Sequence, residues 1–584
     1  MSDTEPIQLG AVAVIALMVV FFGGTFLISF RIRRRRENAD DFMTAGNRIG
    51  FGISAASMTA TWIWASSMYA SASSGYTYGI SGPIHYGLWG ALMILFIYPF
   101  GKRIREVAPK AHTLAEVMYA RHGRGSQLML ASSNIVGSLI SLMSNFIAGG
   151  VLISMLSPFN FVQGVIAIAA GVLLYTLWSG FRASVLTDFI QVMAMLATVV
   201  IVVPVIFVAA DFPAAFETGA ANLTPEQSNF FSSEAFMNQG APYIAAVLAY
   251  AIGNQTIAQR LFAVRKDLIR PTFITATVGY GAMVIGVGML GVLALYLGFE
   301  PTGGNTDNLI PEMAASYLPF ALLCLVFVMI IGALASTADS DLSAMSSIVM
   351  ADVYGQNIAG KQRANPAVMI WVGRITMIAA TALAVVFASF EFSILDLLVF
   401  VGALWGALVF PVIASFYWKK VTNVGFVVGA LAGIAIFIPV RFELFPYGGG
   451  FFALAIAVDV LAVLGIGVIF GLMAFGFFGL RTAYIVGVVT AVAAAPFAIG
   501  TLHEYATLSG SLVAYSASTI LCFFLSFRSK REFDFSVIKE RTGDFDTEHR
   551  HALGDDPETD ETAQAADTVS GPAGARTANS TTKE

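Results

Sequence analysis

The segment Ile331–Tyr354 reads IGALASTADSDLSAMSSIVMADVY, and it decides how the rest of the chain is interpreted. With the apolar residues that precede it from about 319, it is long enough to cross a bilayer, which takes about 20 residues. Ala333, Ser336 and Thr337 stand at i, i+3 and i+4, so they share one helix face. One carbonyl and two hydroxyls from this face, with two carbonyls from a broken helix, would surround a sodium ion with oxygen. The alternative is that both hydroxyls bond back to carbonyls of their own helix.

The composition around this segment is that of a membrane protein. Of the 584 residues, 57% are apolar and 12% are charged, whereas a soluble domain carries about 25% charged residues. The runs Ile15–Phe30, Val192–Ala209 and Phe273–Leu297 contain no charge. An open sheet cannot satisfy its backbone in lipid, so the sequence predicts an all-α integral membrane fold.

The apolar blocks predict about fifteen transmembrane helices. A leading helix is expected at 8–30 and four trailing helices at 424–440, 451–478, 481–498 and 508–527. Between them, ten core helices are expected at 49–72, 83–101, 126–157, 161–180, 183–210, 241–258, 271–297, 319–350, 368–390 and 393–418.

The basic residues predict the orientation, because Lys and Arg collect in cytoplasmic loops. The run RIRRRR (Arg31–Arg36) follows the leading helix, and alternate loops after it are basic. These loops hold Lys102, Arg103 and Arg105; Arg182; Arg260, Arg265 and Lys266; Lys361 and Arg363; Lys419 and Lys420; Arg481; and Arg528, Lys530 and Arg531. A multi-pass protein of the cell membrane is expected, with its N-terminus outside and its C-terminus in the cytoplasm.

Four regions follow from these predictions. Residues 1–48 hold the extracellular N-terminus, the leading helix and a basic cytoplasmic loop; residues 49–418 form the ten-helix core. Residues 419–527 form the four trailing helices, and residues 528–584 form an acidic cytoplasmic tail, which is expected to be disordered.

The first core helix is unusually rich in small and hydroxyl residues. It reads GISAASMTATWIWASSMYASASSGYTYG from Gly52 to Gly79. A broken membrane helix exposes carbonyls and hydroxyls that can ligate a cation near the midplane. The alternative is close packing, since small residues also line helix interfaces.

Two acids are expected at similar depth in the membrane. Asp339 follows the Ser-Thr face in core helix 8, and Asp188 lies in the cytoplasmic third of core helix 5. Ionisable groups within a span usually mark an ion pathway. These carboxylates are expected to hold a second cation or to line the exit path of the first; the alternative is a pair of solvated interfacial acids. Asp341 is expected at the interfacial zone.

A polar cluster interrupts core helix 6 after Gly253. Asn254, Gln255 and Thr256 could present amide groups to a polar solute, and the alternative is an amide contact between helices. The chain has no GxxxxGK[ST] phosphate loop and no HExxH motif. The sequence therefore predicts no ATP-driven transport, no enzymatic activity, no catalytic residue, no metal other than sodium and no nucleic-acid partner.

Five motifs in order give the chain a resemblance to the sodium:solute symporter family. They are DFMTAGN (41–47), TLAEVMYARHG (113–123), SGFRASVLTDFIQ (179–191), NQTIAQRLFA (254–263) and the Ser-Thr helix that ends in MADVYGQ (350–356). The resemblance covers about 41–420. It implies a core of two inverted five-helix repeats (LeuT-like), with core helices 1 and 6 broken.

The resemblance also implies a set of site residues. The first sodium site would use the carbonyls of Ala60, Ile63 and Ala333 and the hydroxyls of Ser336 and Thr337. Members with a second sodium use an acid that matches Asp188, together with hydroxyls one turn below the first site. Those positions hold Asp339 and Ser340 here, so a carboxylate replaces one hydroxyl and could bind a cation more strongly or accept a proton.

The function that follows is sodium-coupled import of a small polar solute by alternating access. Solute would bind against Ser66, Ser67, Asn254 and Gln255. Sugar carriers of the family have a tyrosine after the Asn-Gln pair, where this chain has Thr256, and TWIWASS (61–67) and YGISGP (78–83) look most like the urea-carrier branch. Proline, pantothenate or a short carboxylate stay open as substrates, as do a membrane sensor and a passive channel as functions. The oligomeric state is left open.

Overall fold

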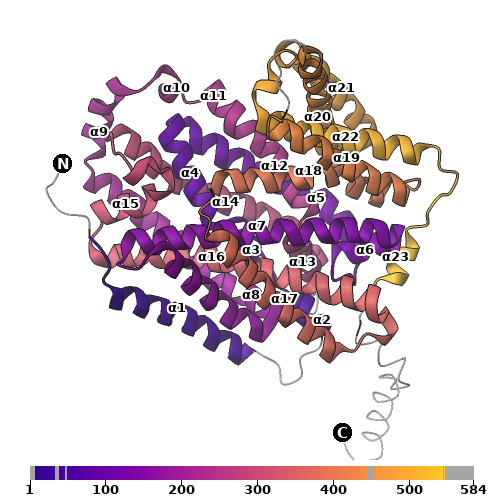
Figure 1. Ribbon diagram of the computed structural model, residues 1–584, viewed down its shortest axis with the longest axis horizontal. Coiled ribbons are helices and arrows are strands. Elements are labelled where there is room, and N and C mark those ends of the chain that lie inside the picture. Colours follow the sequence, from indigo (N-terminus) through magenta and orange to yellow (C-terminus); the bar gives the residue numbers. More distant parts are fainter. Residues whose placement is uncertain are drawn as a thin grey trace, which may run out of the picture.

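The structure is a computed structural model that describes residues 7–32, 39–45, 49–392, 394–444, 451–543 and 545. Within these residues the chain is a bundle of helices (Figure 1). An isolated bridge joins Ile49 to Val264, and the described residues form no strand.

The first half of the chain forms the helices that follow. They are α1 (Ala11–Ile32), α2 (Ala39–Thr44), α3 (Phe51–Trp62), α4 (Ala65–Tyr78), α5 (Ser81–Val107), α6 (Leu114–His122), α7 (Arg124–Leu156), α8 (Phe161–Ala209), α9 (Phe212–Gly219), α10 (Pro225–Ser228), α11 (Ser233–Ala235), α12 (Ala241–Gly253), α13 (Gln255–Ala263) and α14 (Ile269–Tyr296).

The second half is equally helical. It forms α15 (Leu309–Tyr317), α16 (Phe320–Ile348), the π-helical extension η7 (Val349–Ala359), α17 (Pro366–Ala388), α18 (Ile394–Tyr417), α19 (Asn423–Arg441), α20 (Phe452–Phe478), α21 (Leu480–Ala498), α22 (Ala506–Phe527) and α23 (Ser536–Arg541).

Twelve helices in the described part are long and apolar enough to cross a bilayer, which makes the chain a multi-pass membrane protein. The two halves of α8 count separately, because Gly180 interrupts the helix with φ 56°. The outer helices expose apolar side chains: Val488 and Val492 of α21 are 62% and 67% exposed. Exposed apolar side chains gathered on one face are typical of a surface that contacts a membrane or another protein.

Two further helices are interrupted near their middle. α3 ends at Trp62 and α4 begins at Ala65, with Trp64 in an extended conformation between them. α12 ends at Gly253 and α13 begins after Asn254, whose backbone is also extended. Each interruption ends the helical pattern of hydrogen bonds, so backbone groups become free for other partners.

The half-helix α4 packs very closely on α14. A Cβ atom on Gly291 would lie 1.8 Å from the carbonyl oxygen of Ala72. Only a glycine allows the two backbones to approach in this way, as small residues do in other membrane bundles. This contact fixes α4 against α14.

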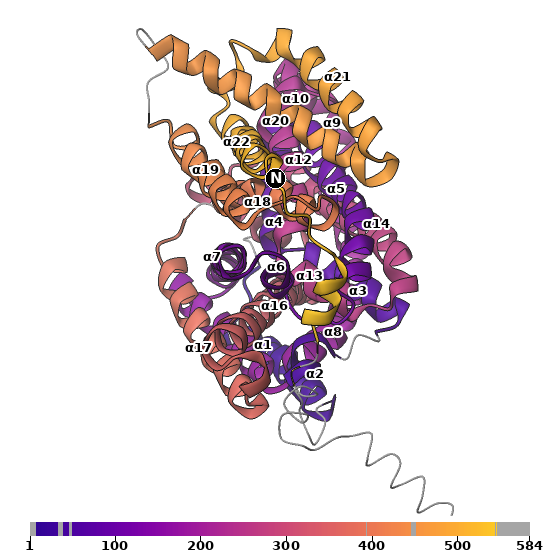
Figure 2. The same cartoon turned by 90° about the vertical axis from the view of Figure 1, so that its right-hand side faces the viewer.

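The remaining helices lie on opposite sides of this core. α19 to α22 gather on one side of the bundle in both views, and α1 lies on the opposite side (Figures 1 and 2). α19 packs against α22 and α20 against α21.

The segment after α22 returns to the core at its α6 end. The backbone N–H of Phe533 donates to the carbonyl of Lys419 at 3.1 Å, and the Arg121 guanidinium lies 4.1 Å from the Phe533 ring centre. The ring of Phe545 is buried against His112, with 5.5 Å between the ring centres. Residues 1–6, Arg33–Arg36 and the acidic tail from 546 lie outside the described residues.

Candidate cation and solute sites

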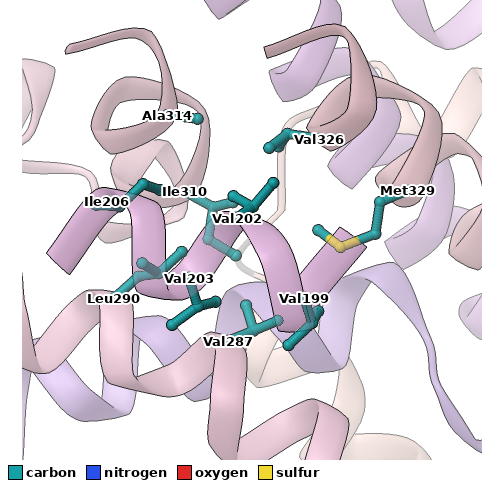
Figure 3. Close-up of a pocket in the computed structure, with 10 residues that line it drawn as sticks. All are labelled: Val199, Val202, Val203, Ile206, Val287, Leu290, Ile310, Ala314, Val326 and Met329. Atoms are coloured by element: carbon teal, nitrogen blue, oxygen red, sulfur yellow. The ribbon is translucent and has the colours of Figure 1, made fainter. Parts of the chain in front are cut away.

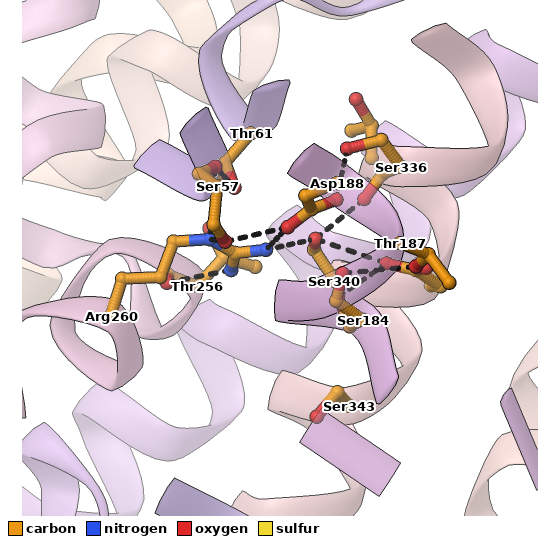
Figure 4. Close-up of polar contacts among 12 residues, drawn as sticks. Ser57, Thr61, Ser184, Thr187, Asp188, Thr256, Arg260, Ser336, Ser340 and Ser343 are labelled. Atoms are coloured by element: carbon orange, nitrogen blue, oxygen red, sulfur yellow. Dashed lines mark hydrogen bonds and ion pairs between the residues drawn. The ribbon is translucent and has the colours of Figure 1, made fainter. Parts of the chain in front are cut away.

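Asp188 of α8 is the centre of a buried polar cluster (Figure 4). Its Oδ1 accepts a hydrogen bond from Ser336 of α16 at 2.5 Å. Its Oδ2 accepts from Ser57 of α3 at 2.6 Å and from Nη2 of Arg260 on α13 at 2.9 Å. Asp188 therefore joins four helices, including the two that border the chain interruptions.

Arg260 reaches into this cluster from the interrupted helix. Its Nη2 also donates to Ser340 at 2.6 Å, and its Nε donates to Ser57 at 2.9 Å. The side chain is 3% exposed. The charge pattern predicted that Arg260 lies in a cytoplasmic loop, and that prediction is wrong. Counting basic residues treats every arginine as solvated, whereas a guanidinium can be buried when a carboxylate neutralises it.

Asp339 forms a second, neighbouring acidic group. Its Oδ2 accepts from the Tyr175 hydroxyl at 2.7 Å and its Oδ1 from Ser184 at 2.6 Å. Its side chain is buried in the bundle, and it interacts electrostatically with Asp188. Two carboxylates thus face one guanidinium. When both acids are ionised the cluster carries one net negative charge, which favours a further cation.

The residues predicted for the first sodium site lie on two helices in contact, α3 and α16. At the end of α3 the N–H of Ile63 donates to the carbonyl of Ala60 at 3.2 Å. On α16 the Thr337 hydroxyl donates to the Ala333 carbonyl at 3.2 Å. This hydrogen bond within the helix was the alternative to sodium ligation that the sequence left open. The Ser336 hydroxyl instead donates to Asp188. Sodium ligation by these five residues stays a prediction.

The residues predicted to bind solute lie in two different places, at the start of α4 and at the link between α12 and α13. Ser66 and Ser67 are buried at the start of α4, where the Ser144 hydroxyl of α7 lies 3.5 Å from that of Ser66. The amide of Gln255 contacts the loop before α6: its Nε2 donates to the His112 carbonyl and its Oε1 accepts from the Leu114 N–H, both at 2.9 Å. This is a contact between structural elements, which was the alternative left open for this cluster.

Asn254 caps the second half of the interrupted helix. Its Oδ1 accepts from the N–H and the hydroxyl of Thr256, both at 2.5 Å. Its Nδ2 is buried and has no hydrogen-bond partner among the residues that the structure describes. Of the predicted pair, Asn254 therefore differs from Gln255, whose amide is fully used in contacts with the loop before α6.

Sequence reasoning missed a polar stripe on α7. Asn134, Ser138, Ser141 and Asn145 are spaced at i, i+4, i+7 and i+11 and are all buried. Ser141 donates at 2.5 Å to Asp341 of α16. The spacing along one face of an otherwise apolar helix was the signal that could have found it. Asp341 was expected at the interfacial zone, but its side chain is buried, because α7 covers it.

Aromatic side chains from both interruptions meet around Tyr250. The ring of Tyr250 lies 5.0 Å from that of Trp62, 5.2 Å from that of Trp64 and 5.1 Å from that of Trp405 on α18. All three contacts are edge-to-face, the geometry that aromatic pairs prefer. Figure 3 shows a different space, a cavity between α8, α14, α15 and α16 lined by apolar residues such as Val202 and Leu290. Its lining has no polar side chain to bind a polar solute.

Residues 42–433, more than half of the chain, match the model of the sodium:solute symporter family. The urea-proton symporter DUR3 of Oryza sativa subsp. japonica is 24% identical over 440 residues, which are 69% of this chain and 60% of that protein. The sodium/pantothenate symporter of Escherichia coli (strain K12) is 26% identical over 445 residues, 72% of this chain and 88% of that protein. The chain thus spans about 60% of the length of the rice relative.

Among solved structures, a Na+-coupled sialic acid symporter has the same fold. The TM-score is 0.63 and the identity 18%, over 82% of this chain and 98% of that one. At this identity the match concerns the fold alone, and the chemistry of the site rests on this chain's own residues.

Proposed function

Because this chain belongs to the sodium:solute symporter family, we propose that it is a secondary active symporter that carries a small polar solute with sodium by alternating access. The observation that carries the proposal is the buried cluster at Asp188, which links the helix with the Ser-Thr face to both interrupted helices. A charged group that joins moving elements can couple cation binding to their rearrangement.

The proposed architecture is the inverted repeat of the LeuT-like fold. Residues 49–418 would form the core and 419–527 the trailing helices. The two interrupted pairs, α3 with α4 and α12 with α13, would be the broken helices of the two repeats. With these pairs and α18 counted as spans, the twelve helices become fifteen. The N-terminus would lie outside and the C-terminus in the cytoplasm, since the basic loops alternate along the chain.

The proposed route for sodium begins at the junction of α3 and α16. Carbonyls of Ala60, Ile63 and Ala333 and hydroxyls of Ser336 and Thr337 would ligate the ion. The hydrogen bond from Ser336 to Asp188 supports a direct connection from this site to the second acidic group. Sodium would then leave past Asp188 and Asp339, or a second cation would bind there with Ser340.

The energy available from one sodium ion is sufficient for active uptake. A potential of about 100 mV contributes about 2.3 kcal/mol per charge, and a tenfold sodium gradient adds about 1.4 kcal/mol. Together they support roughly 400-fold accumulation of a neutral solute. A passive channel would reach equal concentrations only.

Urea is the solute that we place first. The name of the rice relative supports it, and Thr256 stands where sugar carriers of the family have a tyrosine. Proline, pantothenate or a short carboxylate are the alternatives, and the Escherichia coli relative is named for pantothenate.

A proton is the second candidate for a coupling ion. Asp188, Asp339 and Asp341 are buried carboxyl groups close to the proposed cation route, and intramembrane acids of this kind occur in proton relays of transporters. The rice relative is named a urea-proton symporter. If a proton is coupled, it would bind at Asp188 and Asp339, the position that a second sodium ion would otherwise occupy.

Uptake into proteoliposomes tests the proposal. The full chain is reconstituted, and radiolabelled urea, proline, acetate and pantothenate are each supplied with an inward sodium gradient, with choline in its place, and with a proton gradient alone. Accumulation above the outside concentration in sodium supports symport. Equilibration without accumulation would indicate a channel, and binding without transport would indicate a sensor.

A further inference from the structure

The C-terminal strap, residues 529–545, crosses one end of the bundle after α22. Figure 2 shows it running from α22 towards α2, and its helix α23 packs against α6 and α5. The strap is mostly polar, yet the side chains of Ile538 and Phe545 are completely buried. Apolar side chains that leave water in this way attach the strap to the bundle.

The first half of the strap is attached to α5, α6 and the link between α18 and α19. The backbone N–H of Phe533 donates to the carbonyl of Lys419 at 3.1 Å. The Arg121 guanidinium lies 4.1 Å from the Phe533 ring centre, and the Arg103 guanidinium lies 5.4 Å from the ring centre of Phe535. Two arginines of the bundle therefore bind aromatic rings of the strap by cation–π contacts.

The far end of the strap lies between α2, η7 and the loop before α6. The N–H of Phe545 donates to Oδ1 of Asp40 on α2 at 2.9 Å, and its ring centre lies 5.5 Å from that of His112 in the loop. On η7, a Cβ atom at Gly355 would lie 2.8 Å from Cε1 of Phe545, so the missing side chain leaves room for the ring. Phe545 thus joins three segments that are separate in the sequence.

α2 connects this anchor to the two interrupted helices. Nε2 of Gln259 on α13 donates to the Met43 carbonyl of α2 at 2.5 Å. Ile49, just before α3, donates its N–H to the carbonyl of Ala263 at 3.1 Å and accepts at its own carbonyl from the N–H of Arg265 at 3.4 Å. The half-helices α3 and α13 are therefore joined to each other and to α2 at the end of the bundle that the strap crosses.

We propose that the C-terminal strap is an autoinhibitory latch. While Phe545 is in place, the strap holds α2 against η7 and the loop before α6, so this end of the bundle stays closed. Phe545 must leave before α3 and α13 can move during transport. The inference rests on the proposed function, because alternating access requires each end of the bundle to open in turn. A contact made only in the closed form shifts the equilibrium towards that form and lowers the rate.

The strap has the properties of an element that can detach. α23 has six residues, and the strap exposes charged side chains between its anchors, among them Glu532, Asp534, Lys539 and Glu540. Segments with few buried contacts open at a low cost in free energy, so the strap can be released while the membrane helices stay folded. A latch and a structural cap differ in the sign of the effect: loss of a latch accelerates transport, and loss of a cap slows it.

Two variants of the full chain test this sign in proteoliposomes. Phe545→Ala removes the buried anchor, and Phe533→Ala removes the ring that contacts Arg121. The probe is the one among radiolabelled urea, proline, acetate and pantothenate that the wild type accumulates with sodium. Each variant is expected to raise the initial rate of uptake about threefold or more, because a larger fraction of the chain can open. Phe527→Ala, a phenylalanine of α22 that is 59% exposed, is the matched control and should transport like the wild type.

Hydrogen exchange followed by mass spectrometry reports the latch without any solute. In sodium buffer the amides of 533–545 are expected to be protected in the wild type, since the N–H groups of Phe533 and Phe545 are hydrogen-bonded. In both variants they should exchange about tenfold faster, as in a segment that opens locally. Amides of α14 should exchange as in the wild type. If Phe545→Ala also exposes α14, that variant is misfolded and Phe533→Ala decides the test.

The possible failures are distinguishable. Faster exchange of the strap with an unchanged or lower rate of uptake would overturn the latch, since the strap would then only cap the fold. Unchanged exchange in both folded variants would overturn the attachment on which the inference depends, while symport would stand. Absence of sodium-driven accumulation of all four solutes by the wild type would overturn the proposed function together with the latch.

Discussion

Arg260 and Asp188, which are 72 positions apart in the sequence, form an ion pair at 2.9 Å with 3% and 0% of their side chains exposed. The pair connects α13, beyond the second helix interruption, to α8. An isolated charge buried in this way would be very unfavourable, so each charge of the pair offsets the desolvation cost of the other. In the proposed mechanism the guanidinium lies where a second cation would compete for Asp188.

Removal of Arg260 should destabilise the fold strongly. Arg260→Ala leaves Asp188 buried without its cation, and a loss of about 3–5 kcal/mol is expected in the free energy of unfolding. Denaturant unfolding in detergent, followed by tryptophan fluorescence, measures it. Arg265→Ala is the control, because the pair that Arg265 forms with Asp267 is exposed and should change stability by less than about 1 kcal/mol. Equal effects of the two substitutions would contradict a structural role for the buried pair.

The Ser-Thr face should govern the sodium dependence of transport. Ser336→Ala combined with Thr337→Ala removes two proposed ligand oxygens, so we expect the sodium concentration for half-maximal uptake to rise at least tenfold. Sodium titration of uptake in proteoliposomes is the measurement. Ser346→Ala, a buried hydroxyl ten residues further along the chain from Ser336, serves as the control. A double variant with the sodium titration of the wild type would rule out the assigned ligands.

Asp339 should set the number of coupled cations. Asp339→Asn keeps the shape but removes one negative charge from the cluster with Asp188, so a second cation is bound less well. We expect the number of cations transported per solute molecule to fall. Reversal potentials in proteoliposomes, recorded at several sodium and pH gradients, measure this number. A change confined to the pH series would assign the position to a proton, and a change confined to the sodium series would assign it to sodium. An unaltered ratio in both series would leave Asp339 with a structural role only.

The loop before α6 should make stability depend on pH. Burial lowers the pKa of His112, but ion pairs with Asp40 at 2.8 Å and with Glu116 at 3.2 Å outweigh burial and raise the pKa to about 10. A raised folded pKa means that the stabilisation is complete below the ordinary value of about 6.5 and is lost as pH rises towards about 10. We therefore expect the unfolding temperature of the wild type to fall across this window more steeply than that of His112→Gln. Parallel curves would show that the imidazolium adds no stability.

The membrane class and most helices were predictable from the sequence. Long uncharged runs such as Phe273–Leu297 specify a span by length and composition, and α14 (Ile269–Tyr296) covers nearly the same residues. An interruption after Gly253 was predicted from the polar residues that follow it, whereas for the first core helix the small residues before Gly75 left close packing open and the break was implied by the family resemblance. These properties depend on neighbours along the chain, so they need no knowledge of packing.

The partners of the polar side chains were decided by the tertiary structure. Arg260 was expected in solvent and Asp341 at the interface, yet both are buried, because α8 supplies a carboxylate to one and α7 a hydroxyl to the other. Gln255 contacts the loop at His112 rather than leaving its amide free. Such contacts join residues that are far apart in the sequence, and helical periodicity says which face a side chain is on but not which helix packs against it.

By itself, the sequence determined that this protein is a helical membrane bundle and that Ala333, Ser336 and Thr337 share one face of Phe320–Ile348, because hydrophobic length and i, i+3, i+4 spacing are local. Only the tertiary structure decided that Asp188 meets Arg260 and that Trp62, Trp64 and Trp405 gather around Tyr250. The physical reason is that a buried charge or polar atom is stabilised by whichever helix is packed against it, and that choice belongs to the whole bundle.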